Sequence, residues 1–532
     1  MRRLILQLLK EKNLTKERVN DLKRGFCGRT KQAFPAAAEL FQTYRQLLKL
    51  KKLKPLPALE KILKKRGVRT LSGVAVVTVL TKPWPCPGRC VYCPSQAGLP
   101  KSYLKNEPAA QRAYFNNFDP YNQVFSRLKM LFNNGHPTDK IELIIKGGSW
   151  NAYPLAYQTW FVKECFRAAN DFNPKIKKPR KQKPRQLPAQ LLWEQKRNEK
   201  ARGRVIGLTL ETRPDLINEK TIWQMRRLGC TRVELGVQHT DDEILRLVRR
   251  GHALSQTKKA IALLRSFGFK IDFHLMPQLP DSTPKKDWLM FKQIFSDPAL
   301  RPDMIKIYPC AVVANSELYN WFKRGRYKPY SSKKLAELLI QVKAKIIPPY
   351  CRVSRLIRDI PATEIVAGNK ITNLRQYLQE EMKKRGLKCR CLRCREIGHQ
   401  KEWRPKDKSF SKAKLFIQKY ETSGGKEYFL SFEDEKRRVV FAFCRLRLDQ
   451  RGFYPAFIRE LHTYGQLLPL GERDPHASQH RGLGKKLLRV AEKIARQEKS
   501  PSLAVIAGVG ARDYYRKTGF RLKNTYLIKK LS

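Results

Sequence analysis

Short apolar runs alternate with longer amphipathic stretches over the first two thirds of the chain. The runs that we expect to form strands are GVAVVTVLT (from Gly73), KIELIIKGG, RVIGLTLETRPD, TRVELGVQ, KIDFHLMP and MIKIYPC. Each run ends in polar or glycine residues, and a helix-like pattern separates it from the next run. This alternation predicts successive β/α units around a parallel sheet, a partial barrel spanning residues 73–345.

The remaining segments follow other patterns. Residues 1–72 are predicted to form basic helices, because LFQTYRQLLKLKKL and ALEKILKKRG are amphipathic. Residues 174–204 form a basic insertion, and Pro and Lys between 174 and 190 predict a mobile stretch there. After a linker over 346–411, residues 412–532 predict antiparallel strands, a glycine turn that opens a helix, another strand and a final helix. The fold class is therefore α/β multidomain, as 532 residues exceed what one core usually organises.

The charge is strongly positive, with 110 Lys and Arg against 46 Asp and Glu, a net of +64. Residues 1–70 hold 20 basic and 5 acidic residues, and residues 174–204 hold 12 and 2. A polyanionic partner would relieve this self-repulsion. Interleaved aromatic residues, without an amphipathic anchor or a membrane-length apolar run, favour nucleic acid over a membrane. A general compositional bias towards lysine is the competing explanation.

The 12 cysteines are mostly clustered, which indicates metal ligands in a reducing compartment and predicts a cytoplasmic protein. Directly after the first predicted strand, CPGRCVYCP places Cys86, Cys90 and Cys93 in a C-x3-C-x2-C arrangement. A structural zinc site needs four ligands, whereas an iron–sulfur cluster with one open iron needs three. A zinc site with a distant fourth ligand is the alternative. The spacing, position and neighbouring tyrosine resemble the radical S-adenosylmethionine (SAM) superfamily, which implies a 4Fe–4S cluster that binds SAM.

Polar and glycine residues end the later predicted strands, where β/α barrels carry their chemistry. Gly147 and Gly148 would let the backbone approach the SAM amino group, and Glu211 and Arg213 suit an amine, ribose hydroxyls or a carboxylate. Further inward candidates are Gln238 and His274. Taken singly, each could be a polar residue at the barrel mouth whose hydrogen bonds are made within the protein. Their periodic placement together supports a site.

The C-terminal segment carries a second binding pattern, in which Gln479, Gly482 and Gly484 open a predicted helix. Free amides at the positive end of a helix bind a pyrophosphate. The pattern resembles the Q/R-x-x-G-x-G/A loop of GNAT acetyltransferases, which binds acetyl-CoA. Tyr514 and Tyr515 lie where such folds place a tyrosine near the thioester, and core packing is the alternative for one of them.

The combination of the two domains resembles the catalytic subunit of Elongator, the tRNA uridine acetyltransferase family, from about residue 70 to the end. The matching motifs include CPGRCVYCP, GLTLETRPD, FHLMPQLP, RPDMIKIYPC, QHRGLGKKLL and AGVGARDYYRKTGF. The resemblance implies that a SAM-derived 5′-deoxyadenosyl radical takes a hydrogen atom from the acetyl group of acetyl-CoA. The carbon radical then adds to C5 of the wobble uridine in the tRNA anticodon stem-loop, and release of CoA by hydrolysis leaves 5-carboxymethyluridine or a precursor of it.

The same resemblance implies roles for individual residues. Lys306, Tyr308 and Tyr515 would be catalytic, the first two by handling protons or holding the uridine. The residues that it places on acetyl-CoA are Lys140, Glu460, Leu461, His462, Thr463, Ser478, Gln479 and His480.

A second cysteine motif, CRCLRCREIGH, offers Cys389, Cys391, Cys394 and His399 for a structural zinc ion between the domains, with His399 the weaker ligand. Two other functions stay open. One is a protein lysine acetyltransferase with a structural or regulatory radical SAM domain, and the other is a non-catalytic tRNA-binding scaffold. Intact ligand sets at both cofactor sites argue against each. The extra basic charge favours action without other Elongator subunits, and homo-oligomerisation stays open.

Overall fold

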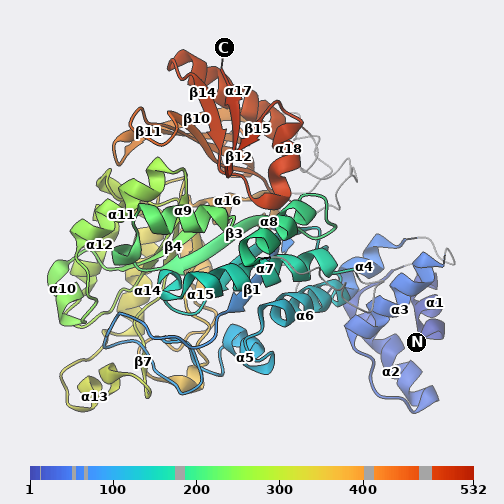
Figure 1. The fold of residues 1–532 in the computed structure, drawn as a ribbon. Helices are drawn as coiled ribbons and strands as arrows, with labels where there is room; N and C mark the ends of the chain where they lie inside the picture. The colour runs from blue at the N-terminus through green and yellow to red at the C-terminus, as the bar shows by residue number, and fades with distance from the viewer. Residues whose placement is uncertain are drawn as a thin grey trace.

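The structure is a computed structural model that describes residues 1–11, 13–50, 55–64, 70–173, 186–400, 413–465 and 482–531. Figure 1 shows a helical N-terminal lobe, a central sheet wrapped by helices and a C-terminal domain above it. In the described part of the chain, no helix combines the length and the apolar character needed to cross a membrane.

The N-terminal lobe consists of helices with a hydrophobic core of their own, which includes Leu40 and Tyr44. It adjoins the central domain at α6 (Pro120–Asn133), where Arg45 donates a hydrogen bond to the carbonyl of Phe132 (2.8 Å) and lies over the Phe132 ring. The amphipathic helices expected in this region are therefore present. They are α1 (Arg2–Lys10), α2 (Lys16–Thr30), α3 (Ala37–Lys49) and α4 (Pro57–Leu63).

The central domain is a half-barrel of parallel strands in the order β1-β2-β3-β4-β5-β6-β8. Six of the strands coincide with the predicted apolar runs. The strands are β1 (Ala75–Leu80), β2 (Lys140–Lys146), β3 (Arg204–Thr212), β4 (Arg232–Gln238), β5 (Lys270–Leu275), β6 (Met304–Ile307) and β8 (Arg352–Arg355).

Helices cover the outer face of this sheet (Figure 1). The helices of this part of the chain are α5 (Pro108–Phe115), α6 (Pro120–Asn133), α7 (Leu155–Asp171), α8 (Leu187–Asn198), α9 (Glu219–Arg227), α10 (Asp242–Leu247), α11 (Leu254–Ser266), α12 (Pro284–Ser296), α13 (Glu317–Lys323) and α14 (Ser332–Gln341). A two-stranded sheet of β7 (Val312–Val313) and β9 (Ile365–Ala367) and the helices α15 (Leu374–Lys384) and α16 (Leu392–Arg395) complete the region before the C-terminal domain.

Two details differ from the sequence-based expectation. Strand β8 belongs to the sheet although it lies beyond the predicted limit at residue 345. It was not predicted, because its sequence RVSR carries too little apolar pattern to be recognised as a strand. Helix α8 lies within the stretch taken as a basic insertion, yet it packs on α7 and buries Leu191 and Asn198. The insertion is thus partly an integral helix, and residues 174–185 lie outside the described residues.

The C-terminal domain is a seven-stranded sheet in the order β10-β11-β12-β13-β14-β16-β15. Its parallel pair, β13 and β14, is joined at only two positions, Phe457 with Ala504 and Ile458 with Val505, so residues 460–463 of β13 extend past this pairing. The chain ends on two strands after a short helix, not on the predicted final helix. The elements are β10 (Lys414–Thr422), β11 (Gly425–Glu433), β12 (Val440–Leu448), β13 (Ala456–Thr463), α17 (Leu483–Gln497), β14 (Ser502–Val505), α18 (Arg512–Arg516), β15 (Arg521–Lys523) and β16 (Tyr526–Lys530).

Buried charges join the C-terminal domain to the half-barrel. The guanidinium of Arg459 on β13 lies 2.9 Å from Asp303 and 3.0 Å from Glu427, and it donates to the carbonyl of Phe269 (2.7 Å). All three charged side chains are fully buried. Because β13 is held in this way against the starts of β5 and β6, its next residues are directed into the half-barrel.

Candidate functional site

The predicted cluster ligands follow β1 on one loop. Cys86, Cys90 and Cys93 line a single cavity of about 660 Å³. The Cys90 thiol hydrogen-bonds to Cys93 and faces Arg250, which together lower its pKa to about 4 despite burial. Three cysteines on one cavity, one of them favouring the thiolate that iron requires, fit a 4Fe–4S cluster with an open position.

Arg250 is a residue of this site that the sequence did not identify. It is buried, donates a hydrogen bond to the carbonyl of Gly236 (2.5 Å), and places another nitrogen 3.6 Å from the sulfur of Cys90. Its motif RRGH is visible in the sequence, but 160 residues separate it from Cys90. Arg213 lies beside the same loop, where it pairs with Asp215 (2.9 Å) and leaves no room for a side chain at Gly88.

The interior of the half-barrel holds a buried cluster of charged side chains. The carboxylate of Glu234 is fully buried and lies 2.6 Å from the Lys146 ammonium, 3.0 Å from the His274 ring and in contact with the Lys306 ammonium. Glu211 accepts from Lys146 (3.1 Å). The structure thus brings together the predicted residues Glu211, His274 and Lys306, and it adds Glu234 and Lys146, which the sequence did not single out although both stand on predicted strands.

Burial shifts the pKa values of this cluster in ways that matter for chemistry. It lowers the pKa of Lys306 to about 8, although Glu234 opposes the shift. It also lowers the pKa of His274, which therefore stays neutral at pH 7, and raises the pKa of Tyr308 to about 12. The ring of Tyr308 meets that of His274 edge to face at 5.3 Å. The site thus offers a lysine that can exchange a proton near neutral pH and a tyrosine that stays protonated.

One cavity of about 780 Å³ connects the two domains. Its lining includes Cys93 near the cluster loop, Lys306 and Tyr308 in the half-barrel, and Leu461 and His462 on β13. Gln238, Glu211, His274 and Glu460 also line it. The His462 ring lies 2.8 Å from the carbonyl of Ser72 at the start of the half-barrel. This one cavity therefore reaches from Cys93 on the cluster loop to β13 of the C-terminal domain, and Cys93 also lines the cavity of the cysteine loop.

Three predicted residues are not part of the lining of either cavity. Gly147 and Gly148 line neither cavity, and Gly147 adopts φ 136° against Thr81, which occupies the position that a side chain would need. Gly147 therefore has a packing reason, whereas Gly148 has room for a side chain but adopts φ 98°, which favours glycine. Lys140 stands at the start of β2, the end of the strand far from the cysteine loop, where burial lowers its pKa to about 8.

The predicted acetyl-CoA turn is described only from Gly482, which begins α17 with φ 78°. A side chain at Gly484 would come within 2.8 Å of the Tyr514 hydroxyl and 3.8 Å of Thr463 and Leu461, so these residues gather at the start of this helix. Tyr515 is instead buried, with its ring 5.9 Å from that of Phe520. Ser478, Gln479 and His480 lie outside the described residues.

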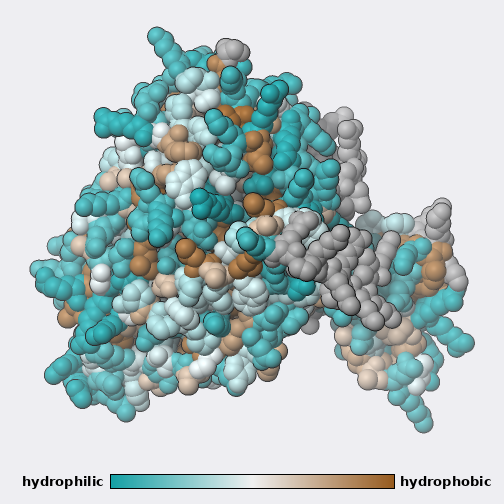
Figure 2. All heavy atoms as spheres, in the orientation of Figure 1, coloured by the Kyte–Doolittle hydropathy of each residue, from teal (hydrophilic) through white to brown (hydrophobic). Residues whose placement is uncertain are grey.

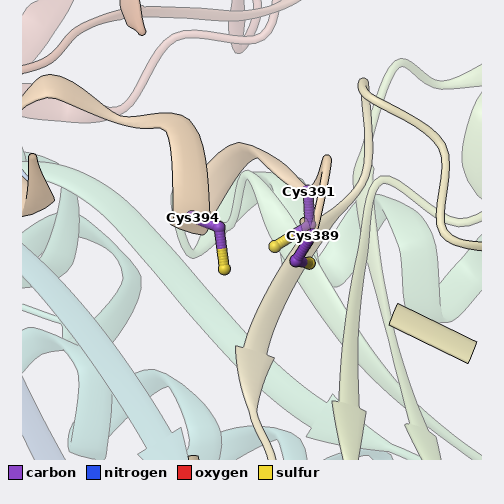
Figure 3. Close-up of side chains that lie close together, drawn as sticks. All are labelled: Cys389, Cys391 and Cys394. Atoms are coloured by element: carbon purple, nitrogen blue, oxygen red, sulfur yellow. The ribbon is translucent and has the colours of Figure 1, made fainter. Parts of the chain in front are cut away.

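The second cysteine group is brought together as its spacing predicted. The sulfurs of Cys389, Cys391 and Cys394 lie within 4.8 Å of one another (Figure 3). Three thiolates fit a tetrahedral zinc site. The structure does not bring His399 to them, because its Nε2 faces the carboxylate of Glu396 at 2.7 Å. Over the described ranges, no fourth histidine, cysteine or carboxylate joins the group.

Comparisons with known proteins agree with this architecture. A family model described as the radical SAM superfamily matches residues 86–287, and one described as the Radical_SAM C-terminal domain matches residues 302–384. The radical SAM half-barrel followed by a C-terminal domain is thereby confirmed. Membership of this superfamily implies a 4Fe–4S cluster and SAM, which the cysteine loop fits.

Relatives match both domains together. The chain is 41% identical to the tRNA uridine(34) acetyltransferase of Methanocaldococcus infernus over 100% of this chain and 99% of that protein. It is 44% identical to the enzyme of the same name from Methanocaldococcus jannaschii (88% and 87%) and 37% identical to human Elongator complex protein 3 (88% and 86%). The solved structure of Methanocaldococcus infernus Elp3 with an N-terminal deletion superposes with a TM-score of 0.73 at 42% identity, covering 87% of this chain and 100% of that one.

Proposed function

The chain belongs to the tRNA uridine(34) acetyltransferase family, and from this premise we propose that it modifies C5 of the wobble uridine of tRNA with SAM and acetyl-CoA. The proposed product is 5-carboxymethyluridine or a precursor of it. Acetyl-CoA, tRNA and SAM would meet in one site, and the observation that carries the proposal is the cavity lined by both Cys93 and His462.

The cysteine loop would hold the cluster and SAM, which supply a 5′-deoxyadenosyl radical when bound. Arg250 would keep a thiolate favoured at Cys90 by its positive charge (3.6 Å). On the other side, Leu461, Thr463 and Tyr514 gather at the start of α17, whose free backbone amides suit the pyrophosphate of CoA. Because β13 extends past its pairing with β14, its residues 460–463 can carry the acetyl end towards the half-barrel.

Lys306 and Tyr308 would act on the uridine between these two ends. Lys306 has a pKa near 8 and can donate a proton to the base or hold one of its carbonyl oxygens. Tyr308 stays protonated and can donate a hydrogen bond. Glu234 positions Lys306 and Lys146 at once, which keeps both ammonium groups directed into the cavity.

The deciding experiment uses the reconstituted protein with SAM, a reductant, tRNA and acetyl-CoA whose methyl group carries deuterium. The expected product is a carboxymethylated uridine that retains the remaining deuterium, together with deuterium in 5′-deoxyadenosine. Cys86→Ala, Cys90→Ala and Cys93→Ala should each abolish both products and the bound iron. If deuterium never reaches 5′-deoxyadenosine while uridine is still modified, the radical route is wrong.

The other functions predict different outcomes. A protein lysine acetyltransferase would transfer the intact acetyl group to lysine in all three cysteine variants, and a scaffold would bind tRNA without consuming SAM. The continuous cavity disfavours both, because neither requires the half-barrel to open onto β13. We place the reaction in the cytoplasm, with tRNA as the partner, and expect the chain to act without other Elongator subunits.

A further inference from the structure

Helix α5 carries the most exposed large apolar side chain in the described part of the molecule. Phe115 at its last position is 72% exposed, and its neighbour Tyr114 is 40% exposed. Their rings lie 6.3 Å apart, and the ammonium of Lys105 lies 4.3 Å over the ring of Tyr114. Figure 2 shows that hydrophilic residues predominate on the face it draws, so aromatic rings left in solvent require a reason.

The helix stands at the wall of the cavity proposed to receive the uridine. Ala109 and Arg112 line that cavity, and Ala110 and Ala113 pack in a buried cluster with Leu80, the last residue of β1. Residues three apart share one face of a helix, so Phe115 continues the face of Arg112 one turn further from the cavity. Figure 1 places α5 at the outer edge of the molecule, beside α6.

The chain turns back sharply after α5, and the Phe118 ring meets the Tyr114 ring edge to face at 6.5 Å, so Phe115 is the more exposed of the two rings of this pair. Asn117 and Phe118 both have positive φ values, 50° and 55°; asparagine adopts this region readily, whereas a bulky side chain such as that of Phe118 rarely does. Phe118 donates a backbone hydrogen bond to Ala113 (2.8 Å), and Asn117 donates one to Tyr114 (3.0 Å). The chain therefore reverses at once into α6. Such strain concentrates at functional sites.

We propose that Tyr114 and Phe115 form a stacking platform for unpaired RNA bases next to the base that enters the cavity. Every base has a π-face, so aromatic side chains bind single-stranded RNA without reading its sequence, whereas paired bases cannot be reached. Lys105 and Arg112 supply the positive charge that complements the adjoining phosphates. This inference rests on the proposed function, because it takes RNA to be the substrate.

The test measures binding of a synthetic RNA hairpin with an unpaired loop, labelled with 2-aminopurine beside the loop uridine. Phe115→Ala should weaken binding roughly 5- to 150-fold, the effect of removing one base–aromatic stack, and should reduce the quenching of 2-aminopurine. The slope of log affinity against log salt should not change, because no phosphate contact is lost. Phe115→Trp should retain both affinity and quenching.

Two matched controls separate stacking from other effects. Leu289→Ala removes another exposed apolar side chain (51% exposed), on α12, and should change nothing. Binding of a fully paired RNA duplex should be the same in the wild type and in Phe115→Ala. If the variant loses duplex and hairpin binding equally, stacking is refuted.

The outcomes also separate this inference from the proposed function. If the wild type binds and modifies RNA while Phe115→Ala has unaltered hairpin affinity, only the stacking platform is refuted. The exposed rings would then be assigned to a contact with a protein instead. If the wild type neither binds the hairpin nor modifies uridine, the proposed function is refuted together with the platform.

Discussion

Glu234 is expected to control the protonation of the lysines in the half-barrel. It is fully buried and contacts Lys146, Lys306 and His274, which come from three other strands. Glu234→Gln keeps the shape of the side chain and removes its charge. Lys146 would keep Glu211 as a partner, whereas the acidic partner that Lys306 retains among the described residues is Asp272, at 3.9 Å.

The size of the effect follows from the attraction that is lost. Two unit charges about 4 Å apart attract by roughly 4 kcal/mol at an effective dielectric constant of 20. This corresponds to roughly three pKa units. Burial already lowers the pKa of Lys306 to about 8, and Glu234 is the largest of the influences that raise it. The variant should therefore hold Lys306 neutral at pH 7.

The direction of this change in the pKa of Lys306 predicts a specific dependence of the reaction rate on pH. In the wild type, Lys306 is protonated below about pH 8, so a reaction that uses its proton should proceed fully below that pH and decline above it. In Glu234→Gln the decline should move below pH 7. The assay is the rate of uridine modification at constant ionic strength between about pH 5.5 and 9, measured by nucleoside mass spectrometry. A shift of roughly 1 pKa unit or more in the decline would be resolved.

Stability provides an independent readout. Removing one partner of a buried ion pair costs about 3–5 kcal/mol. Hydrogen exchange of peptides covering β4 should therefore be faster in Glu234→Gln, by the factor that this loss in the free energy of unfolding implies. Glu337→Gln is the matched control, because its pair with Arg385 is solvent-exposed and contributes little. An unchanged pH profile together with unchanged exchange in Glu234→Gln would refute the reasoning.

Three further predictions concern other parts of the molecule. Cys391→Ser should remove zinc and lower the Tm, whereas His399→Ala should retain zinc by metal analysis, because its ring faces Glu396; zinc loss in His399→Ala would contradict this. Arg459→Met should lower the Tm and increase proteolysis between the domains, since Asp303 and Glu427 each lose a buried partner, Asp303 keeping Arg445 at 3.6 Å and Glu427 keeping Arg265 at 3.0 Å; an unaltered Tm would argue against the interface. Tyr514→Phe should raise the KM for acetyl-CoA more than Tyr515→Phe does, because only the Tyr514 hydroxyl adjoins Gly484; the reverse order would assign the role to Tyr515.

The strands of the half-barrel could be predicted because their burial shows directly in the sequence. The six apolar runs coincide with six strands, and β4 is buried along nearly its whole length. Strand β8 could not be found, because two of its four residues are arginines. Arg352 is accommodated there by Glu396, a partner 44 residues away that no local pattern reveals.

The site could be predicted only where a residue type is informative by itself. The spacing of the cysteines identified both groups, but spacing does not fix the direction of a side chain, so it could not show that His399 faces Glu396. Glu234 was missed for a related reason. A single glutamate on a strand is unremarkable until the fold brings Lys146 and Lys306 to it from two other strands.

The buried charges at the domain interface are better explained by geometry than by stability. Taking Arg459, Asp303 and Glu427 out of water costs several kcal/mol for each ion, and their attraction largely offsets that cost, so an apolar interface could be equally stable. An apolar contact can slide, however, whereas the guanidinium of Arg459 satisfies two carboxylates and the carbonyl of Phe269 in one arrangement only. Glu460 follows Arg459 directly and lines the shared cavity. Fixing Arg459 therefore fixes where β13, the strand proposed to hold acetyl-CoA, enters the half-barrel, and the proposed transfer of a hydrogen atom from acetyl-CoA requires that the two domains keep this register.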